Sequence, residues 1–145
     1  MNGRAWTIDD LDEIAALEAE CFPVAPWTRR MLAESLLSER FCTTLLEEDG
    51  IITAYGGMSV LDEEGEIELI ATAEMYRGCG RGSKVLEDLL TTAKSKGVKR
   101  VFLEVRVSNS PAQGLYLKHG FTGVYARTRY YPDGEDAIVM KKELL

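Results

Sequence analysis

The sequence contains few of the residues that usually hold metal ions or disulfides. It has three cysteines, Cys21, Cys42 and Cys79, which are widely spaced and form no CxxC pair, and a single histidine, His119. An odd number of scattered cysteines argues against a disulfide framework, and one histidine is too few to complete a zinc site with them. We therefore expect no bound metal and a reducing compartment.

Positive charge and long apolar runs are also scarce. The 17 Lys and Arg residues against 24 Asp and Glu residues give a net charge of −7. This balance argues against nucleic-acid binding through a general basic surface and favours a cationic partner. No apolar run approaches the roughly 18 residues of a membrane span, and the N-terminus has no signal pattern. We expect a soluble, cytoplasmic protein in which residues 1–145 form one domain.

Glycines gather in the stretch Tyr76–Ser83, which follows an extended run and precedes an amphipathic helix. Gly78, Gly80 and Gly82 allow backbone dihedral angles that side chains forbid, and the helix start offers free N–H groups, so a phosphate would suit this stretch. The spacing is not the G-x-G-x-x-G of dinucleotide-binding proteins or the G-K-[ST] of a Walker loop, which disfavours NAD and nucleoside triphosphates. On the glycines alone, a turn that binds no ligand is equally acceptable.

Two helices are predicted near the start of the chain, after at most a very short strand. Thr7 with Asp10 marks the start of the first, and apolar residues recur at helical spacing as far as Cys21. Thr28 can cap the second. Its apolar face would carry Met31, Leu32, Ser35 and Leu36. The proline-containing elbow Phe22–Trp27 breaks the chain between the two helices and should lie near the surface.

An antiparallel pair of strands should follow. Residues 41–46 and 51–60 have strand-like composition, and the Asp49-Gly50 pair between them is a strong hairpin signal.

A strand, a helix and a second strand then form a βαβ unit around the glycines. Residues 66–73 are the first strand, a helix begins at Ser83, and residues 100–107 are the second strand. One face of the second strand would carry Val101, Leu103, Val105 and Val107, and the other Phe102, Glu104 and Arg106. The two strands should be parallel, with the glycine stretch at the carboxyl end of the first, where ligands sit in such sheets.

The last part of the chain predicts a short helix and a hairpin. Ser110 would cap the helix and Gly120 would end it in a left-handed conformation. Residues 124–131 and 137–141 would be the two antiparallel strands. The predicted fold class is therefore α/β (α+β), with a mixed central sheet that is antiparallel early and parallel around the glycines, flanked by about four helices.

The sequence resembles the GNAT family of acetyl-coenzyme A-dependent N-acetyltransferases, and the resemblance runs along nearly the whole chain. Two motifs carry it. The similar motifs are Arg77-x-x-Gly80-x-Gly82, which resembles the family's pyrophosphate loop, and Asn109-Ser110-Pro111-Ala112 followed by Leu115-Tyr116-x-x-x-Gly120-Phe121, which resembles its second cofactor segment. The resemblance implies acetyl-coenzyme A as cosubstrate and a GNAT-like mixed sheet.

Further segments are similar to one group of that family, the bacterial RimI group, which acetylates the N-terminal alanine of a small-subunit ribosomal protein. They are Phe22-Pro23 with Pro26-Trp27, Leu103-Glu104-Val105-Arg106, Tyr130-Tyr131-Pro132 and Glu135-Asp136-Ala137-Ile138-Val139-Met140. The chain departs from the family at Ala71-Thr72-Ala73-Glu74, where Val-Asp-Pro is preferred, and in the elbow, which carries an insertion.

The resemblance implies a set of cofactor contacts made largely by the main chain. Ile70, Ala71 and Thr72 would line the pantetheine arm, and Asn109 would hold the cofactor from the neighbouring strand end. The pyrophosphate would lie against the loop formed by Arg77, Gly78, Cys79, Gly80, Arg81, Gly82 and Ser83.

Acetyl transfer to an amine also needs a base and an acid. The resemblance implies Glu104 as the base toward the incoming ammonium and Tyr116 as the acid toward the coenzyme A thiolate, because a phenol and a thiolate have comparable basicity. Spacing alone favours a surface carboxylate or a partner of Arg106 for Glu104, and a packed helical aromatic for Tyr116; the resemblance reverses both preferences. Trp27, Tyr130 and Tyr131 could wall the acceptor channel, although aromatic residues on a hairpin often serve only for cross-strand packing.

The expected acceptor is a basic protein or peptide N-terminus, such as that of a ribosomal protein. An α-amine has a pKa near 8 and a lysine amine one near 10.4, so neutralising the lysine at pH 7 costs roughly 3 kcal/mol more. Two alternatives stay open: acetylation of lysine side chains or small-molecule amines, and a non-catalytic acyl-coenzyme A sensor.

Overall fold

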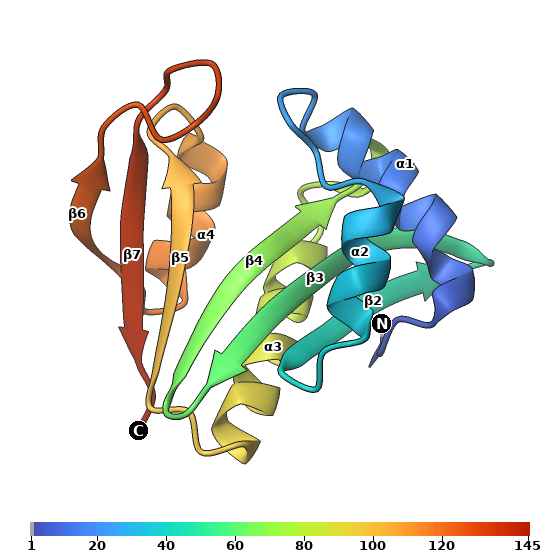
Figure 1. Cartoon of the computed structure of the whole chain (residues 1–145), viewed down its shortest axis with the longest axis horizontal. Helices are drawn as coiled ribbons and strands as arrows, with labels where there is room; N and C mark the ends of the chain where they lie inside the picture. The colour runs from blue at the N-terminus through green and yellow to red at the C-terminus, as the bar shows by residue number, and fades with distance from the viewer. Residues whose placement is uncertain (1) are drawn as a thin grey trace.

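The computed structural model describes residues 2–145 and contains one seven-stranded sheet with the strand order β1-β2-β3-β4-β5-β7-β6 (Figure 1). The strands are β1 (Gly3–Arg4), β2 (Phe41–Glu48), β3 (Ile51–Leu61), β4 (Glu64–Thr72), β5 (Arg100–Arg106), β6 (Thr122–Arg127) and β7 (Ala137–Glu143). The mixed sheet predicted from the sequence is confirmed, as is the very short first strand.

Within the same residues, four α-helices flank the sheet, as predicted. They are α1 (Leu11–Cys21), α2 (Arg29–Leu36), α3 (Arg81–Ser95) and α4 (Ser110–Lys118), with two 3-10 turns, η1 (Ile8–Asp10) and η2 (Glu74–Tyr76). Helices α1 and α2 lie on one face of the sheet, and α3 and α4 lie on the other (Figure 1).

The sheet is antiparallel except where β4 meets β5. These two strands are parallel, as the βαβ pattern predicted, but only Glu64–Glu66 pair with Arg100–Phe102. Beyond those residues the carboxyl ends of β4 and β5 diverge, which is visible as a wedge between the two arrows in Figure 1. The wedge is therefore at the edge of the sheet where ligands of parallel strands bind.

A β-bulge in β4 changes which face its side chains occupy. Gly57 pairs with Leu69 and Met58 pairs with Ile67, so Glu68 is an extra residue on β4. Ile67 packs in the core beneath α3 and α4, whereas Leu69 packs in the core beneath α1 and α2. Regular pleating would place both on one face. Because bulges also increase local twist, this one helps to turn the end of β4 away from β5.

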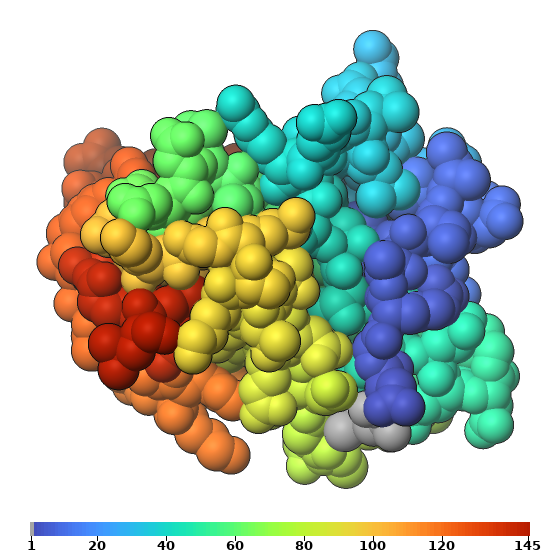
Figure 2. Space-filling view, turned by 90° about the horizontal axis from the view of Figure 1, so that it is seen from below, coloured from blue at the N-terminus to red at the C-terminus, as the bar shows by residue number. Residues whose placement is uncertain are grey.

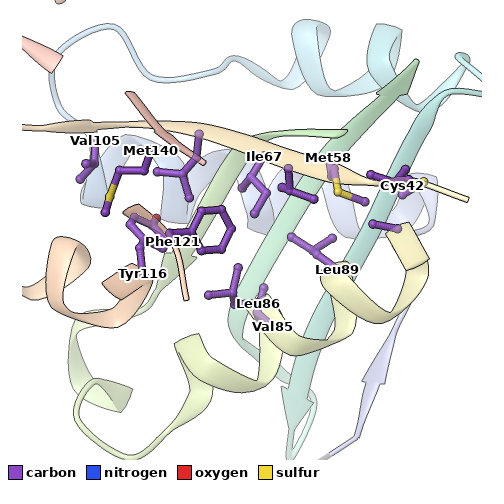
Figure 3. Packing of buried hydrophobic residues seen from close by; sticks show 14 of the residues in the cluster. Cys42, Met58, Ile67, Val85, Leu86, Leu89, Val105, Tyr116, Phe121 and Met140 are labelled. Atoms are coloured by element: carbon purple, nitrogen blue, oxygen red, sulfur yellow. The ribbon is translucent and has the colours of Figure 1, made fainter. Parts of the chain in front are cut away.

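The larger core lies between the sheet and the α3–α4 pair. Leu86 and Leu89 of α3 and Tyr116 of α4 point toward the sheet, and Phe121 lies beside Tyr116 (Figure 3). These side chains are at most 5% exposed, and burying one such side chain contributes roughly 1.5–3 kcal/mol. This core fixes α3 and α4 relative to the diverging strands.

The helix starts were predicted well, with two corrections. Thr7 and Asp10 form the expected capping box, and the Thr28 hydroxyl caps α2. For α4, however, the cap is Asn109 instead of Ser110, because the Asn109 side chain accepts the free amide three residues later. Helix α3 begins at Arg81, two residues earlier than predicted, directly after the glycine at position 80.

Two residues predicted on apolar faces are partly exposed. Met31 is 42% exposed because the short helix α2 buries Leu32 fully and leaves its neighbour at the rim. Val107 is 43% exposed because the pairing of β5 with β7 stops at Arg106. The rest of the predicted strand alternation in β5 is confirmed, since Val101, Leu103 and Val105 are buried.

The C-terminal residues pack against the segment that follows α3. Figure 2, seen from below, shows these red residues beside the yellow segment. The amide of Leu144 donates to the carbonyl of Lys99 at 2.7 Å, which joins the end of the chain to the start of β5.

In residues 2–145, the helices are all too short or too polar to cross a membrane.

Candidate active site

A cleft of about 610 Å³ opens where β4 and β5 diverge. Its walls come from α1, the elbow after α1, the ends of β4 and β5, the start of α4, and the loop between β6 and β7. Of the residues predicted for the site, the cleft is lined by Trp27, Ile70, Glu104, Asn109, Tyr116 and Tyr131. The fold thus gathers side chains from six separate segments in one cavity.

Glu104 reaches the cleft from β5. The neighbouring Leu103 and Val105 are buried on the opposite face of the strand, and the Glu104 side chain is 18% exposed. Its ion-pair partner is Arg127 of β6, with Nε 3.5 Å from Oε1. The alternative partner considered from the sequence, Arg106, is instead bound to two other carboxylates. Glu104 is therefore a largely shielded, ion-paired carboxylate that lines the cleft.

Tyr116 combines a packing position with access to the cleft. It is 5% exposed, and its ring packs against Phe121 with centroids 5.9 Å apart (Figure 3). Burial raises the pKa of Tyr116 well above its ordinary value, with a smaller contribution from Tyr131. The same side chain lines the cleft and presents a protonated phenol there. Its raised pKa makes proton donation to a thiolate less favourable than the comparable basicity assumed from the sequence.

The glycine stretch forms the turn before α3. Gly78 and Gly80 have φ angles of +83° and +84°, and Gly80 is the cap residue of the helix. A Cβ atom at either position would meet no other atom within 4 Å, so the space beside the turn is open. Both glycines are thus needed for the backbone angle and not to avoid a neighbouring group. The turn leaves the first N–H groups of α3 available to an anion.

The two arginines of this turn bind elsewhere in the protein. Arg81 donates to both carboxylate oxygens of Glu48, at 2.6 and 2.8 Å, and to the carbonyl of Tyr76 at 3.0 Å. This guanidinium holds the pKa of Glu48 at about 2. Arg77 donates from Nε to the carbonyl of Thr72 at 3.0 Å. The side chains of these arginines brace the turn, so its capacity for an anion lies mainly in the main chain.

The structure separates the predicted cofactor residues into two groups. Ile70 and Asn109 line the cleft. Outside its lining are Ala71, Thr72, Arg77, Gly78, Cys79, Gly80, Arg81, Gly82 and Ser83. The second group continues from the end of β4 into α3. Ser83 is further fixed by His119, whose Nε2 is 3.1 Å from its Oγ, which ties α3 to the end of α4.

One wall of the cleft is the elbow Phe22–Trp27, and a buried carboxylate holds it. Glu18 of α1 is 3% exposed, accepts the amide of Trp27 at 3.1 Å and accepts the hydroxyl of Tyr55 at 2.7 Å. Burial raises the pKa of Glu18. The Trp27 ring also stacks on Phe41, with centroids 6.4 Å apart. The elbow is therefore attached to both α1 and β2.

The opposite wall is the loop of residues 128–136, and it corrects the predicted hairpin. Strand β6 ends at Arg127, so Tyr130 and Tyr131 lie in the loop and not in a strand. Their rings meet edge to face with centroids 5.1 Å apart. Tyr131 lines the cleft, whereas Tyr130 lies beside Glu104, whose carboxylate raises the pKa of Tyr130 to about 12.

Sequence reasoning missed two residues that line the cleft, Glu18 and Glu68. Glu18 was one of several acidic residues of an amphipathic helix, and its helical spacing from Leu11 and Ile14, which share its buried face, was the only available signal of its burial. Glu68 gave no signal because a bulge depends on the register with β3.

Within residues 2–145, no group of three His, Cys, Asp or Glu side chains is placed to hold a metal ion.

The fold is that of an N-acetyltransferase. The chain belongs to the GNAT acetyltransferase family, whose profile matches residues 11–121. It is therefore an enzyme of the acyltransferase class, and the family uses acetyl-coenzyme A.

Two relatives with similar sequences are N-acetyltransferases. The [ribosomal protein bS18]-alanine N-acetyltransferase of Escherichia coli strain K12 is 33% identical over 143 residues, covering 90% of this chain and 96% of its own. An N-alpha-acetyltransferase of Sulfurisphaera tokodaii is 42% identical over 154 residues, covering 97% and 92%.

Solved structures agree with the sequence comparison. The crystal structure of the E. coli ribosomal-protein-S18-alanine N-acetyltransferase matches with a TM-score of 0.88 and 31% identity, over 98% of this chain and 92% of that one. The PaiA N-acetyltransferase of Thermoplasma acidophilum, solved in complex with coenzyme A, matches with a TM-score of 0.84 over 99% and 98%. At 16% identity, the second match shows the fold alone.

Proposed function

We propose that this protein transfers the acetyl group of acetyl-coenzyme A to the N-terminal α-amine of a protein, and that its acceptor is the N-terminal alanine of a small-subunit ribosomal protein. The observation that carries the proposal is that Glu104 and Tyr116, from different elements, line one cleft at the divergence of β4 and β5. The similarity to the E. coli enzyme named for bS18 alanine supports this acceptor. Such an acceptor would place the reaction in the cytoplasm.

The cosubstrate would be held mainly by the main chain. N–H groups of residues 78–83 would bind the pyrophosphate at the start of α3, where the helix dipole favours an anion. Main-chain groups of Ile70, Ala71 and Thr72 would line the pantetheine arm in the wedge, and Asn109 would contact it from the start of α4. The open space beside Gly78 and Gly80 fits a bulky anion at that position.

The chemistry would use one base and one acid. Acetyl-coenzyme A supplies the acetyl group as a thioester. Glu104 would take a proton from the ammonium of the acceptor, directly or through water, so that the amine can form the new N–C bond. As the C–S bond breaks, Tyr116 would donate its phenolic proton to the departing thiolate. The nitrogen would lose its second proton to water, and water would return a proton to Tyr116. A main-chain N–H at Ala71 or Thr72 would face the thioester carbonyl.

The acceptor would enter between the two walls of the cleft. Trp27 on the elbow, with Tyr130 and Tyr131 on the opposite loop, would flank its first residues. An α-amine, with an ordinary pKa near 8, suits a single carboxylate base better than a lysine amine near 10.4. The net charge of −7 favours a basic acceptor chain.

The test is acetyl transfer from radiolabelled acetyl-coenzyme A to basic peptides that begin with alanine. The matched controls are the same peptides with a blocked N-terminus and with an added internal lysine. We expect transfer only to peptides with a free N-terminus. Equal transfer to blocked peptides would contradict the α-amine as acceptor and favour lysine. Binding of acetyl-coenzyme A without transfer to any amine in a panel would point to a non-catalytic sensor.

A further inference from the structure

The loop of residues 128–136 carries one wall of the cleft, yet no strand holds it in place. Strand β6 ends before it and β7 begins after it at Ala137. The loop has internal hydrogen bonds, from the Tyr131 amide to the Glu135 carbonyl and from Gly134 back to Tyr131. These bonds set its shape, but its position over the cleft must come from contacts with other elements.

Those contacts converge on one side chain at the end of β5. Arg106 Nη1 donates to both oxygens of Asp133, at 3.0 and 2.9 Å, and to Oε1 of Glu135 at 2.8 Å. The other oxygen of Glu135 accepts the amide of Ser108 at 2.9 Å. Ser108 and Arg106 together hold the pKa of Glu135 below its usual range. The amide of Val107 also donates to the carbonyl of Asp136 at 3.2 Å, so the loop is joined to the end of β5 by one guanidinium and by two main-chain amides.

The same guanidinium also fixes the aromatic ring that faces the cleft. Its Cζ lies 4.0 Å from the centroid of the Tyr131 ring, a cation–π contact. Arg106 and Tyr131 both line the cleft. The Arg106 side chain is 23% exposed, so these contacts are partly shielded from solvent and less screened than surface pairs. A planar guanidinium can bind carboxylates and stack on a ring at once, which a lysine cannot do.

We propose that Arg106 is a positioning residue for the acceptor: it holds residues 128–136 against the end of β5 and so sets Tyr131 as a wall of the acceptor channel. This inference rests on the proposed function. It differs from the assignment of Glu104 as base, which lies two residues earlier on the same strand, because Arg106 would act through the loop and not on the reacting atoms.

Strand β5 offers a matched control at its other end. Arg100 lies on the same face as Arg106 and also has two carboxylate partners, Glu64 at 3.4 Å and Glu143 at 3.8 Å. It is far along the strand from the cleft and does not line it. Replacing either arginine removes one charge and two ion pairs. Only the replacement of Arg106 should release the loop of residues 128–136.

The experiment compares Arg106→Gln and Arg100→Gln in the full chain, by steady-state kinetics with an alanine-starting basic peptide. For Arg106→Gln we expect KM for the peptide to rise about tenfold, the change produced by 1.4 kcal/mol of lost binding. KM for acetyl-coenzyme A and kcat should stay within about twofold of wild type. Arg100→Gln should leave all three constants within about twofold. An unchanged peptide KM in Arg106→Gln, or equal rises in the two variants, would overturn the proposal.

Two further measurements separate positioning from general damage. Combining Arg106→Gln with Glu135→Gln should raise the peptide KM by less than the sum of the single variants, because both residues hold the same loop and share one ion pair. Fully additive effects would contradict this. Hydrogen exchange of residues 128–136 should be faster in Arg106→Gln than in Arg100→Gln, and equal exchange would also contradict the proposal. If Arg106→Gln fails to fold, Arg106→Lys replaces it, with an intermediate KM expected.

Failure of this inference can be told apart from failure of the proposed function. If the wild-type protein does not acetylate alanine-starting peptides, the proposed function is wrong, and hydrogen exchange still reports whether Arg106 holds the loop. If the wild type acetylates them and the two arginine variants behave alike, only the positioning role is wrong.

Discussion

The two sides of the cleft are built in different ways. The side proposed for acetyl-coenzyme A comes mainly from one continuous stretch, the end of β4 and the turn into α3, with Asn109 added from the start of α4, and it presents mostly main-chain groups. The side proposed for the acceptor comes from an elbow, a strand and a loop that are far apart in sequence. It presents side chains, each held by a contact with another element.

This difference predicts how each side responds to substitution. A main-chain N–H survives most side-chain changes, provided that the backbone can keep its dihedral angles. A side chain that binds, or transfers a proton, is lost when it is replaced. Substitutions on the acceptor side should therefore have large and specific effects, while on the cofactor side only changes at positive φ should matter.

The largest effect is expected for Glu104→Gln. Loss of a positioned base typically lowers the rate by 10²–10⁴-fold, so we expect kcat to fall about 100- to 1,000-fold. KM for acetyl-coenzyme A should change less than about threefold, because the glycine turn is untouched. Initial rates with both substrates varied give these constants. A kcat within tenfold of wild type would show that proton removal does not depend on this carboxylate.

A smaller loss is expected for Tyr116→Phe, about 10- to 100-fold in kcat, since the phenyl ring preserves the packing against Phe121 and removes only the proton donor. The raised pKa of Tyr116 gives a second readout. The folded state favours the neutral phenol, so this stabilisation is full below the unfolded pKa near 10 and is lost as pH rises further. Chemical denaturation from pH 8 to 11 should show a steeper loss of stability in wild type than in Tyr116→Phe. Equal slopes would contradict the burial of an ionisable phenol.

On the cofactor side, the informative change is Gly80→Ala. Its φ of +84° costs an alanine about 1 kcal/mol. We expect KM for acetyl-coenzyme A to rise roughly fivefold if the turn shifts its N–H groups to relieve that strain. Gly97→Ala is the control, because Gly97 has a φ of +80° at the other end of α3 and equally open surroundings. It should lose similar stability with no change in KM, as measured by thermal unfolding and kinetics. The same KM rise in both would mean that the turn has no special part in binding.

The contrast between the two sides of the cleft also explains what could be predicted from the sequence. The glycine turn, the parallel strands and the position of Glu104 follow from local patterns: glycine spacing, strand alternation and the change to helical periodicity. The placement of Tyr130 and Tyr131 in a loop was missed, because aromatic residues favour strands and only the pairing with β7 shows where β6 ends. The bulge at Glu68 and the contacts of Glu18 and Arg106 depend on partners 9 to 37 residues away. No local pattern encodes such contacts.

The smallest effect is expected for Cys79→Ala, which tests the main-chain side most directly. Cys79 is exposed and lies between the two glycines with positive φ. If the anion is held by N–H groups, removing the thiol should leave KM for acetyl-coenzyme A within about twofold, because the backbone donor remains. A bulky group at the same place should act differently, since it would fill the space that the ligand needs. Alkylation of wild-type Cys79 should therefore raise that KM, and bound coenzyme A should slow the alkylation, as followed by mass spectrometry of the intact chain. If Cys79→Ala itself raised KM tenfold, side chains would hold the cofactor on this side too, and the contrast between the two sides would fail.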